Sequence, residues 1–279
     1  LPLHNIGMRF ALVLCFCQIA FSQDPSPDAK EIIRRSIDRD LFNFERLKDY
    51  TYTERDEERA YDTHGKLKKT SIETHEIFFQ GGHDYARLIG RDDKPLSTKE
   101  ARKEQEKLDK EIEKREHESA EDKAKIEKER REQRKFLDEV PDAFNFQLVG
   151  EEEVSGKPAW VILAEPKPDY RIKDGRAKFI TKLRAKVWID KGEYQWVKVD
   201  AEAMDKVSFG FHMIQIEPGA TLHFEQTRVN DEVWLPAAAK VYVNARLVLF
   251  KQLHSELDVQ FRDYKKFQAD SHLVGDEGR

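Results

Sequence analysis

Apolar and polar residues alternate along most of residues 178–266, the pattern that indicates half-buried β-strands. In the first of these strands, Phe179, Leu183 and Val187 fall at apolar positions, with Lys182 and Lys186 between them. The same period predicts strands at residues 178–189, 194–203, 208–216, 221–229, 233–243 and 246–264. Turn-forming Gly, Pro, Asn and Asp residues lie where the alternation breaks. The pattern therefore predicts a large antiparallel sheet.

The first part of the chain adds an amphipathic helix and further strands. Ile33, Ile37, Leu41 and Phe44 recur every three to four residues, which predicts a helix over residues 28–47 with one apolar face. Alternation then predicts strands at residues 50–61, 67–79, 84–89, 146–154 and 159–165. The apolar face of the helix must pack on something apolar, and the sheet is the available surface.

Residues 97–140 interrupt the strands with a segment of unusually high charge. Ser97 with Glu100, and Ser119 with Asp122, match the capping box that begins a helix. The few apolar residues do not maintain a heptad, so we expect a solvated helical arm rather than a coiled coil. Basic and acidic residues occur in nearly equal numbers, which argues against a nucleic-acid role for this arm.

The expected sheet is too wide for one helix to cover. About ten or eleven strands at about 4.8 Å spacing span about 45 Å, whereas a helix is about 10 to 12 Å across. A twisted sheet of this size usually curls. The predicted fold class is therefore α+β, with a large curved antiparallel sheet, an incomplete β-barrel, wrapped around an amphipathic helix. Residues 23–279 are expected to form one domain with the charged helical arm inserted.

Such a curled sheet would leave a concave apolar cavity of the kind that binds apolar ligands. The residues that we expect to line it are Val187, Ile189, Phe209, Phe211, Leu222, Phe224, Val241 and Val243. The alternative is that these side chains simply form a well-packed core.

Residues 1–22 are interpreted as a signal peptide, with the true start of translation at Met8 and cleavage before Gln23. The apolar run is shorter than the roughly 20 residues of a membrane-spanning helix, and no later segment qualifies. A lipoprotein acylated at Cys15 or Cys17 is the less favoured alternative, because neither cysteine follows a small residue. Cleavage removes both cysteines, which excludes a disulfide scaffold, a Cys nucleophile and Cys-ligated zinc.

Composition and motifs exclude several function classes. A hydrophobic content of 39% supports a folded core, while a net charge of −5 argues against a general nucleic-acid binder. His75 and Glu76 lack the second His of a zinc-protease motif, and His212 and His223 lie eleven residues apart. No phosphate-binding glycine loop or nucleophile elbow occurs. We therefore expect no catalytic residue, no metal, no cofactor and no enzyme activity.

A row of basic residues is a second candidate site. Lys178, Lys182, Arg184 and Lys186 share one face of the predicted strand at residues 178–189. This patch could dock on anionic head groups or on an acidic partner. The alternative is a solvated sheet face whose charges are balanced by acids and discourage edge pairing.

Three phrases carry a resemblance to a known family. They are Val-Trp-Ile-Asp at residues 187–190, Tyr-Gln-Trp-Val at 194–197 and Val-Asn-Asp-Glu-Val-Trp-Leu-Pro at 229–236. With the N-terminal helix and the long meander, the chain resembles the outer-membrane lipoprotein-sorting (Lol carrier-like) superfamily, which includes related periplasmic regulatory sensors. The resemblance covers residues 28–88 and 145–267, and the charged arm departs from the plain carriers.

The resemblance implies a periplasmic half-barrel whose apolar cavity, lidded by helices, accepts acyl chains of lipids or lipoproteins without covalent chemistry. The alternative is a non-enzymatic regulatory or scaffolding protein of the same fold that acts through an envelope protein partner. An outer-membrane β-barrel is disfavoured by the highly charged residues 53–59. A hydrolase has no sequence feature in its favour.

Overall fold

The computed structural model describes residues 28–209, 214–247 and 251–267. The expected signal peptide and Phe211 lie outside these ranges. The first half of the described chain contains α1 (Ala29–Arg46), β1 (Tyr50–Tyr61), β2 (Leu67–Gln80), β3 (His83–Arg91), β4 (Lys94–Pro95), α2 (Thr98–Glu116), α3 (Ala120–Glu132) and α4 (Val140–Ala143). The second half contains β5 (Phe144–Val154), β6 (Lys157–Pro166), β7 (Leu183–Asp190), β8 (Trp196–Ala203), β9 (Val207–Phe209), β10 (Ile214–Ile216), β11 (Thr221–Val229), β12 (Val233–Leu247) and β13 (Lys251–Lys266).

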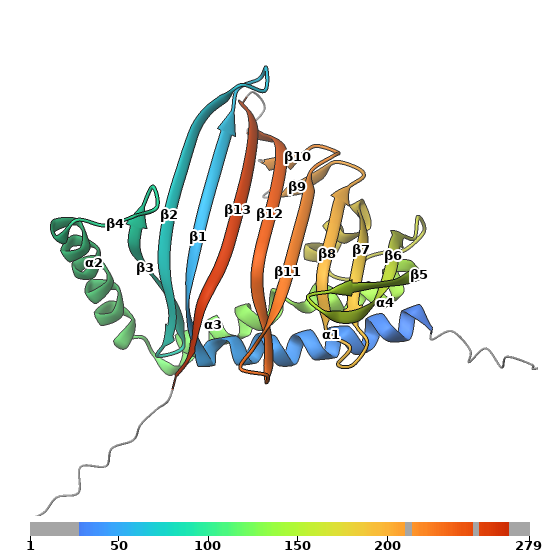
Figure 1. Ribbon diagram of the computed structural model, residues 1–279, viewed down its shortest axis with the longest axis horizontal. Helices are drawn as coiled ribbons and strands as arrows, with labels where there is room; N and C mark the ends of the chain where they lie inside the picture. Colours follow the sequence, from blue (N-terminus) through green and yellow to red (C-terminus); the bar gives the residue numbers. More distant parts are fainter. Residues whose placement is uncertain (1–27, 210–213, 248–250, 268–279) are drawn as a thin grey trace, which may run out of the picture.

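Within the described ranges, all strands belong to one antiparallel sheet of 13 strands that is not closed (Figure 1). The order is β4-β3-β2-β1-β13-β12-β11-β8-β7-β6-β5; off this path, β10 pairs with β12, and β9 pairs with β10. The first long strand therefore pairs with the last one in the middle of the sheet. The helix α1 runs across the strands near one end of the sheet. This architecture confirms the predicted α+β fold, a large curved sheet wrapped around the amphipathic helix.

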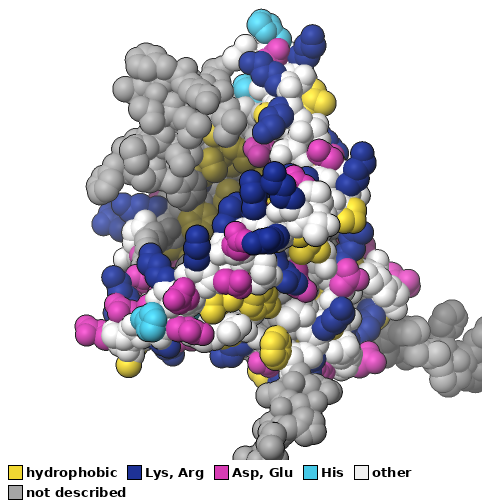
Figure 2. All heavy atoms as spheres, turned by 90° about the vertical axis from the view of Figure 1, so that its left-hand side faces the viewer, with side chains coloured by type: hydrophobic (Ala, Val, Ile, Leu, Met, Phe, Trp, Pro, Cys, Tyr) yellow, Lys and Arg dark blue, Asp and Glu magenta, His cyan; other side chains and the backbone are white. Residues whose placement is uncertain are grey.

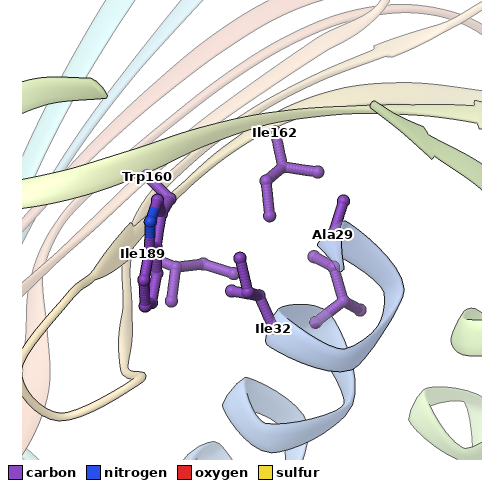
Figure 3. Close-up of a cluster of buried hydrophobic side chains, with 6 residues drawn as sticks. Ala29, Ile32, Trp160, Ile162 and Ile189 are labelled. Atoms are coloured by element: carbon purple, nitrogen blue, oxygen red, sulfur yellow. The ribbon is translucent and has the colours of Figure 1, made fainter. Parts of the chain in front are cut away.

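The helix begins and packs as its sequence predicts. The side chain of Asp28 accepts a hydrogen bond from the backbone N–H of Lys30 at 3.0 Å and so caps the first turn. Ile32 and Ile33 then point toward the sheet and are 2% and 4% exposed. Figure 3 shows Ile32 beside the sheet residues Trp160, Ile162 and Ile189. Burial of this apolar stripe fixes α1 on the sheet.

The prediction of a strand beginning at residue 178 was wrong. A short 3₁₀ helix, η3 (Gly175–Lys182), precedes β7, which begins only at Leu183. Ile180 in η3 is 3% exposed and packs with Ala143, Phe144 and Ala164. A tertiary contact thus overrides the local alternation, because the helical turn directs Ile180 into this cluster.

Two other boundaries also differ from the predictions. The expected single strand at residues 208–216 is divided into β9 and β10, which pair with each other as antiparallel strands. No break occurs at residues 244–245, between the two predicted strands, because β12 continues to Leu247. The alternation of Val241, Val243 and Ala245 in fact extends through that position.

The charged arm forms two helices that fold back on the domain. Both predicted capping boxes are present, with Ser97 accepting from the Glu100 N–H at 3.3 Å and Ser119 from the Asp122 N–H at 3.1 Å. One side of α2 lies on β3, where Leu108 is only 6% exposed. The arm is therefore attached to the sheet along one edge.

Candidate functional site

The candidate site is the face of the sheet on which α1 packs, here called the inner face. Its closed end lies under the start of α1, where Trp160, Ile162 and Ile189 form one cluster with Ile32 and Ile33. Ile162 and Ile189 are fully buried at 0% exposure. The cavity candidate Ile189 is therefore a core residue, and the packed-core alternative describes this position.

The apolar surface continues across β8, β11 and β12, here called the open part of the inner face. One row of paired residues runs from Val187 through Val199 and Phe224 to Ala239. Leu222 pairs with Val241 in the next row toward the far end of the strands. These side chains share one face because residues two apart along a strand point the same way.

The described cavity candidates in this open part are less covered than those at the closed end. Leu222 is 39% exposed, while Val187, Phe224, Val241 and Val243 are half-buried. The Phe224 ring contacts the ring of Trp196 at a centroid distance of 5.1 Å. Phe209 lies in β9, and its side chain is outside the described part. Figure 2 shows hydrophobic side chains in the depth of a hollow, bordered by Lys and Arg side chains.

A buried polar network joins α1 to the sheet next to this surface. The Asn43 amide donates to Gln195 Oε1 at 2.6 Å, and Gln195 Nε2 donates to Gln226 Oε1 at 2.6 Å. The backbone N–H of Trp234 donates to Asn43 Oδ1 at 3.2 Å. The side chains of these three polar residues are at most 9% exposed. Satisfied buried amides fix α1 in one register.

The sequence analysis missed this network. The available signal was a polar residue, Asn43, adjacent to the apolar positions Leu41 and Phe44 of an amphipathic helix. Its partners, Gln195 and Trp234, lie in the turn before β8 and on β12, so only the tertiary structure reveals the pairing.

Asp40 is a second buried polar group on α1, and it connects the helix to the charged arm. Its carboxylate lies 2.7 Å from a guanidinium nitrogen of Arg134, just after α3. Burial raises the pKa of Asp40 above its ordinary value, while the positive charge of Arg134 opposes that rise. The guanidinium of Arg134 also lies 4.3 Å over the Phe44 ring. The arm thus contributes to the environment of the inner face.

The β1 and β2 end of the inner face is acidic rather than apolar. Glu54 and Asp56 on β1 are paired with His75 and Glu73 on β2. His75 lies 3.5 Å from Asp56 and 3.9 Å from Glu73, and the contact with Asp56 raises the pKa of His75. The inner face therefore changes from hydrocarbon to carboxylate along the sheet.

The basic residues of the second candidate site do not share one strand. Lys178 and Lys182 belong to η3, and only Arg184 and Lys186 lie on β7. Lys182 forms an ion pair with Asp205, Arg184 with Glu202 at 2.8 Å, and Lys186 with Glu152 at 3.1 Å. Acids thus balance these three bases, and a docking role for the patch stays a prediction.

Searches for other kinds of site give two findings. Within the described ranges, His, Cys, Asp and Glu side chains form no group of three or more that could hold a metal ion. None of the helices found there has both the length and the apolar character needed to cross a bilayer.

No protein-family model matches the chain, and no curated protein matches it. Several solved structures do. An outer membrane lipoprotein-sorting protein domain from Vibrio parahaemolyticus is 9% identical with a TM-score of 0.34, over 85% of this chain and 94% of that one. A DUF1329 family protein from Desulfovibrio piger is 12% identical with a TM-score of 0.33, over 88% and 94% of the two chains.

A LolA superfamily protein from Nitrosomonas europaea is 8% identical with a TM-score of 0.30, over 86% of this chain and 94% of that one. Two of these three structures carry the name of the LolA superfamily or of lipoprotein sorting.

Proposed function

We propose that the chain is a non-enzymatic, carrier-like protein of the periplasm that holds an acyl chain of a lipid or lipoprotein on the inner face of its half-barrel. The observation that carries this proposal is the incomplete cover of the open part. Leu222 is 39% exposed, whereas Ile162, on the same face at the closed end, is 0% exposed. An apolar surface that the described chain leaves partly uncovered can gain free energy by binding hydrocarbon.

The energetics suit reversible binding. Burial of one methylene group contributes about 0.8 kcal/mol, so several methylenes on this surface give useful affinity without a covalent step. The ligand would lie on Val187, Phe224 and Val241, beside the rigid cluster under α1. Uptake and release then require only that the acyl chain of the ligand moves between apolar environments, with no covalent step.

The test is native mass spectrometry, with lipid extraction, on protein purified without detergent from cells that export it. A charge introduced on the inner face by Leu222→Asp should remove the bound acyl ligand. Tyr242→Asp is the matched control, because Tyr242 is 43% exposed on the adjacent position of β12, which points to the opposite face.

Retention of ligand in Tyr242→Asp and its loss in Leu222→Asp would support the proposal. A clean ligand-free mass for the unmodified protein, with no uptake of added lipid or lipopeptide, would contradict it.

The alternative function is a regulatory or scaffolding role through a protein partner of the cell envelope. The charged arm favours it, because Arg102 and Lys107 of α2 are 81% and 71% exposed while the helix is anchored to β3. Deletion of residues 99–135 should then abolish partner capture. Unchanged capture would exclude the arm as the docking surface.

A further inference from the structure

A pocket lies at the acidic end of the inner face. Residues of the C-terminal end of α1, strands β1 to β3 and helix α3 line it. Its volume is about 290 Å³. Its lining includes the aromatic residues Phe44, Tyr50, Tyr52 and Phe79, the acidic residues Glu54 and Asp84, and the basic residues Lys48 and Arg130. The ammonium group of Lys48 is already paired with Glu45 at 3.3 Å. Aromatic rings attract cations through their electron-rich faces, and a carboxylate adds direct charge attraction. The composition of the pocket therefore suits an organic cation.

Glu54 is available for such a ligand. It is half-buried, and within the described ranges its carboxylate has no hydrogen bond or ion pair. Burial raises its pKa, the neighbouring negative charge of Asp56 raises it further, and the charge of His75 opposes both effects without cancelling them. A cation placed in the pocket would relieve both effects, because it would stabilise the ionised carboxylate.

The protein already places a cation of its own in this pocket. The guanidinium carbon of Arg130, on α3, lies 4.8 Å from the centre of the Phe44 ring and 5.4 Å from that of Phe79. The Arg130 side chain is 11% exposed, and its nearest acidic atom, Glu127 Oε2, is 3.9 Å away. One terminal nitrogen of this guanidinium is buried without a hydrogen-bond partner in the described part of the chain.

This arrangement makes Arg130 a replaceable occupant. Ring faces hold the guanidinium, but its hydrogen-bonding capacity is incompletely used, which is costly for a buried charged group. A ligand cation that reaches Glu54 directly would make a better set of contacts. Departure of Arg130 would require only a rearrangement of α3, whose other side chains are largely exposed.

The pocket is continuous with the open part of the inner face. The ring of Tyr52 contacts that of Phe261 on β13 at a centroid distance of 6.1 Å. Val259 lies two residues before Phe261 on β13 and pairs with Ala239 on β12. Ala239 in turn pairs with Phe224 on β11. An apolar chain on Phe224 could therefore extend over β13 and place its end group in the aromatic pocket.

We propose that this pocket binds the cationic group, an alkylammonium or a guanidinium, of an amphiphile whose apolar chain lies on the open part of the inner face, and that Arg130 occupies the pocket when no ligand is bound. The placement of the apolar chain rests on the proposed carrier function. The preference for a cationic end group rests on the aromatic rings and the Glu54 carboxylate that line the pocket. Asp56 and Glu73 on the adjacent strands would also disfavour an anionic end group.

The test compares ligands that share one chain and differ in the end group. Dodecylguanidinium, dodecylammonium, dodecanol and dodecanoate are titrated below their micelle concentrations into the full chain by isothermal calorimetry. Both cations should bind about tenfold more tightly than dodecanol, a difference typical of one added charge contact. Dodecanoate should bind most weakly. The better of the two cations indicates whether the natural group is an amine or the side chain of an arginine.

Variants separate the roles of the two key residues. Glu54→Gln should abolish the preference for cations over dodecanol, whereas Glu58→Gln, on the same face of β1 but outside the pocket, should retain it. Arg130→Ala should increase the affinity for both cations, and Arg131→Ala, a residue 66% exposed on the same helix, should not. Equal binding of all four ligands, or a cation preference unaffected by Glu54→Gln, would overturn the proposal.

A short cation distinguishes the failure of this inference from failure of the proposed function. Ethylguanidinium has almost no apolar chain and can occupy only the aromatic pocket. If it binds in a Glu54-dependent manner while the dodecyl chain adds no affinity, the pocket assignment holds and the carrier function is wrong. If the dodecyl ligands bind without regard to charge, the carrier function holds and the pocket assignment is wrong.

Discussion

The closed end and the open part of the inner face have similar amino-acid compositions but different surroundings. Ile189 and Val187 are two residues apart on β7 and point the same way, yet the first is fully buried and the second only half-buried. The difference arises because α1 crosses the strands at one end only (Figure 1). Apolar side chains thus form a core where a helix covers them and a candidate binding surface where it does not.

The largest expected effect comes from truncation at the closed end. Ile162→Ala should reduce the free energy of unfolding by about 2 to 5 kcal/mol, because it leaves a cavity in a fully packed cluster. Val241→Ala in the open part should cost less than about 1 kcal/mol, because the site is only half-buried. Urea unfolding followed by circular dichroism measures both. Equal losses would mean that the open part is also packed core.

The next effect concerns the polar network that attaches α1. Asn43→Ala removes the partner of the Gln195 side chain and of the Trp234 backbone N–H, both of which stay buried. We expect a loss of about 1 to 3 kcal/mol in the free energy of unfolding, the usual cost of unsatisfied buried groups. Gln147→Ala, at an exposed amide on β5, is the control and should change stability little. A neutral Asn43→Ala would show that water replaces the amide.

The smallest effect is the pH dependence contributed by Asp40, the buried carboxyl on α1 that pairs with Arg134. Its folded-state pKa is raised, so the folded protein binds this proton more tightly than the unfolded chain, and ionisation costs stability as the pH rises from about 3.8 through the raised value. Asp40→Asn should therefore gain stability relative to the unmodified protein over that window, by at most about 1.4 kcal/mol per pH unit. Parallel unfolding curves from pH 3 to 7 for the two proteins would show that Arg134 fully compensates the burial.

Local chemistry made much of the fold predictable. The cap at Asp28, the capping boxes at Ser97 and Ser119 and the strand alternation depend on residues close in sequence, and the structure contains the expected elements. The predicted limits of strands were wrong where a contact with residues distant in sequence determined the conformation. Ile180 in η3 is the clearest case, since its partners in α4 and β5 lie more than thirty residues earlier.

The candidate site was predictable only in part. Alternation correctly assigned Val187, Leu222, Phe224 and Val241 to one face, but it could not tell which of them a helix would cover. The aromatic pocket was not foreseen, because it combines α1, three strands and the arm. Nothing in the local sequence of α3 distinguishes Arg130 from the other basic residues around it.

The pairing of β1 with β13 has a consequence for how the molecule assembles. These strands form the middle of the sheet, although strands β2 to β12 and the charged arm lie between them in sequence. Such non-local pairing slows folding, since a long loop must close before the contacts that reward it can form. The two ends of the chain must therefore meet before the sheet is continuous, and loss of the last strand would divide it at its centre rather than trim an edge.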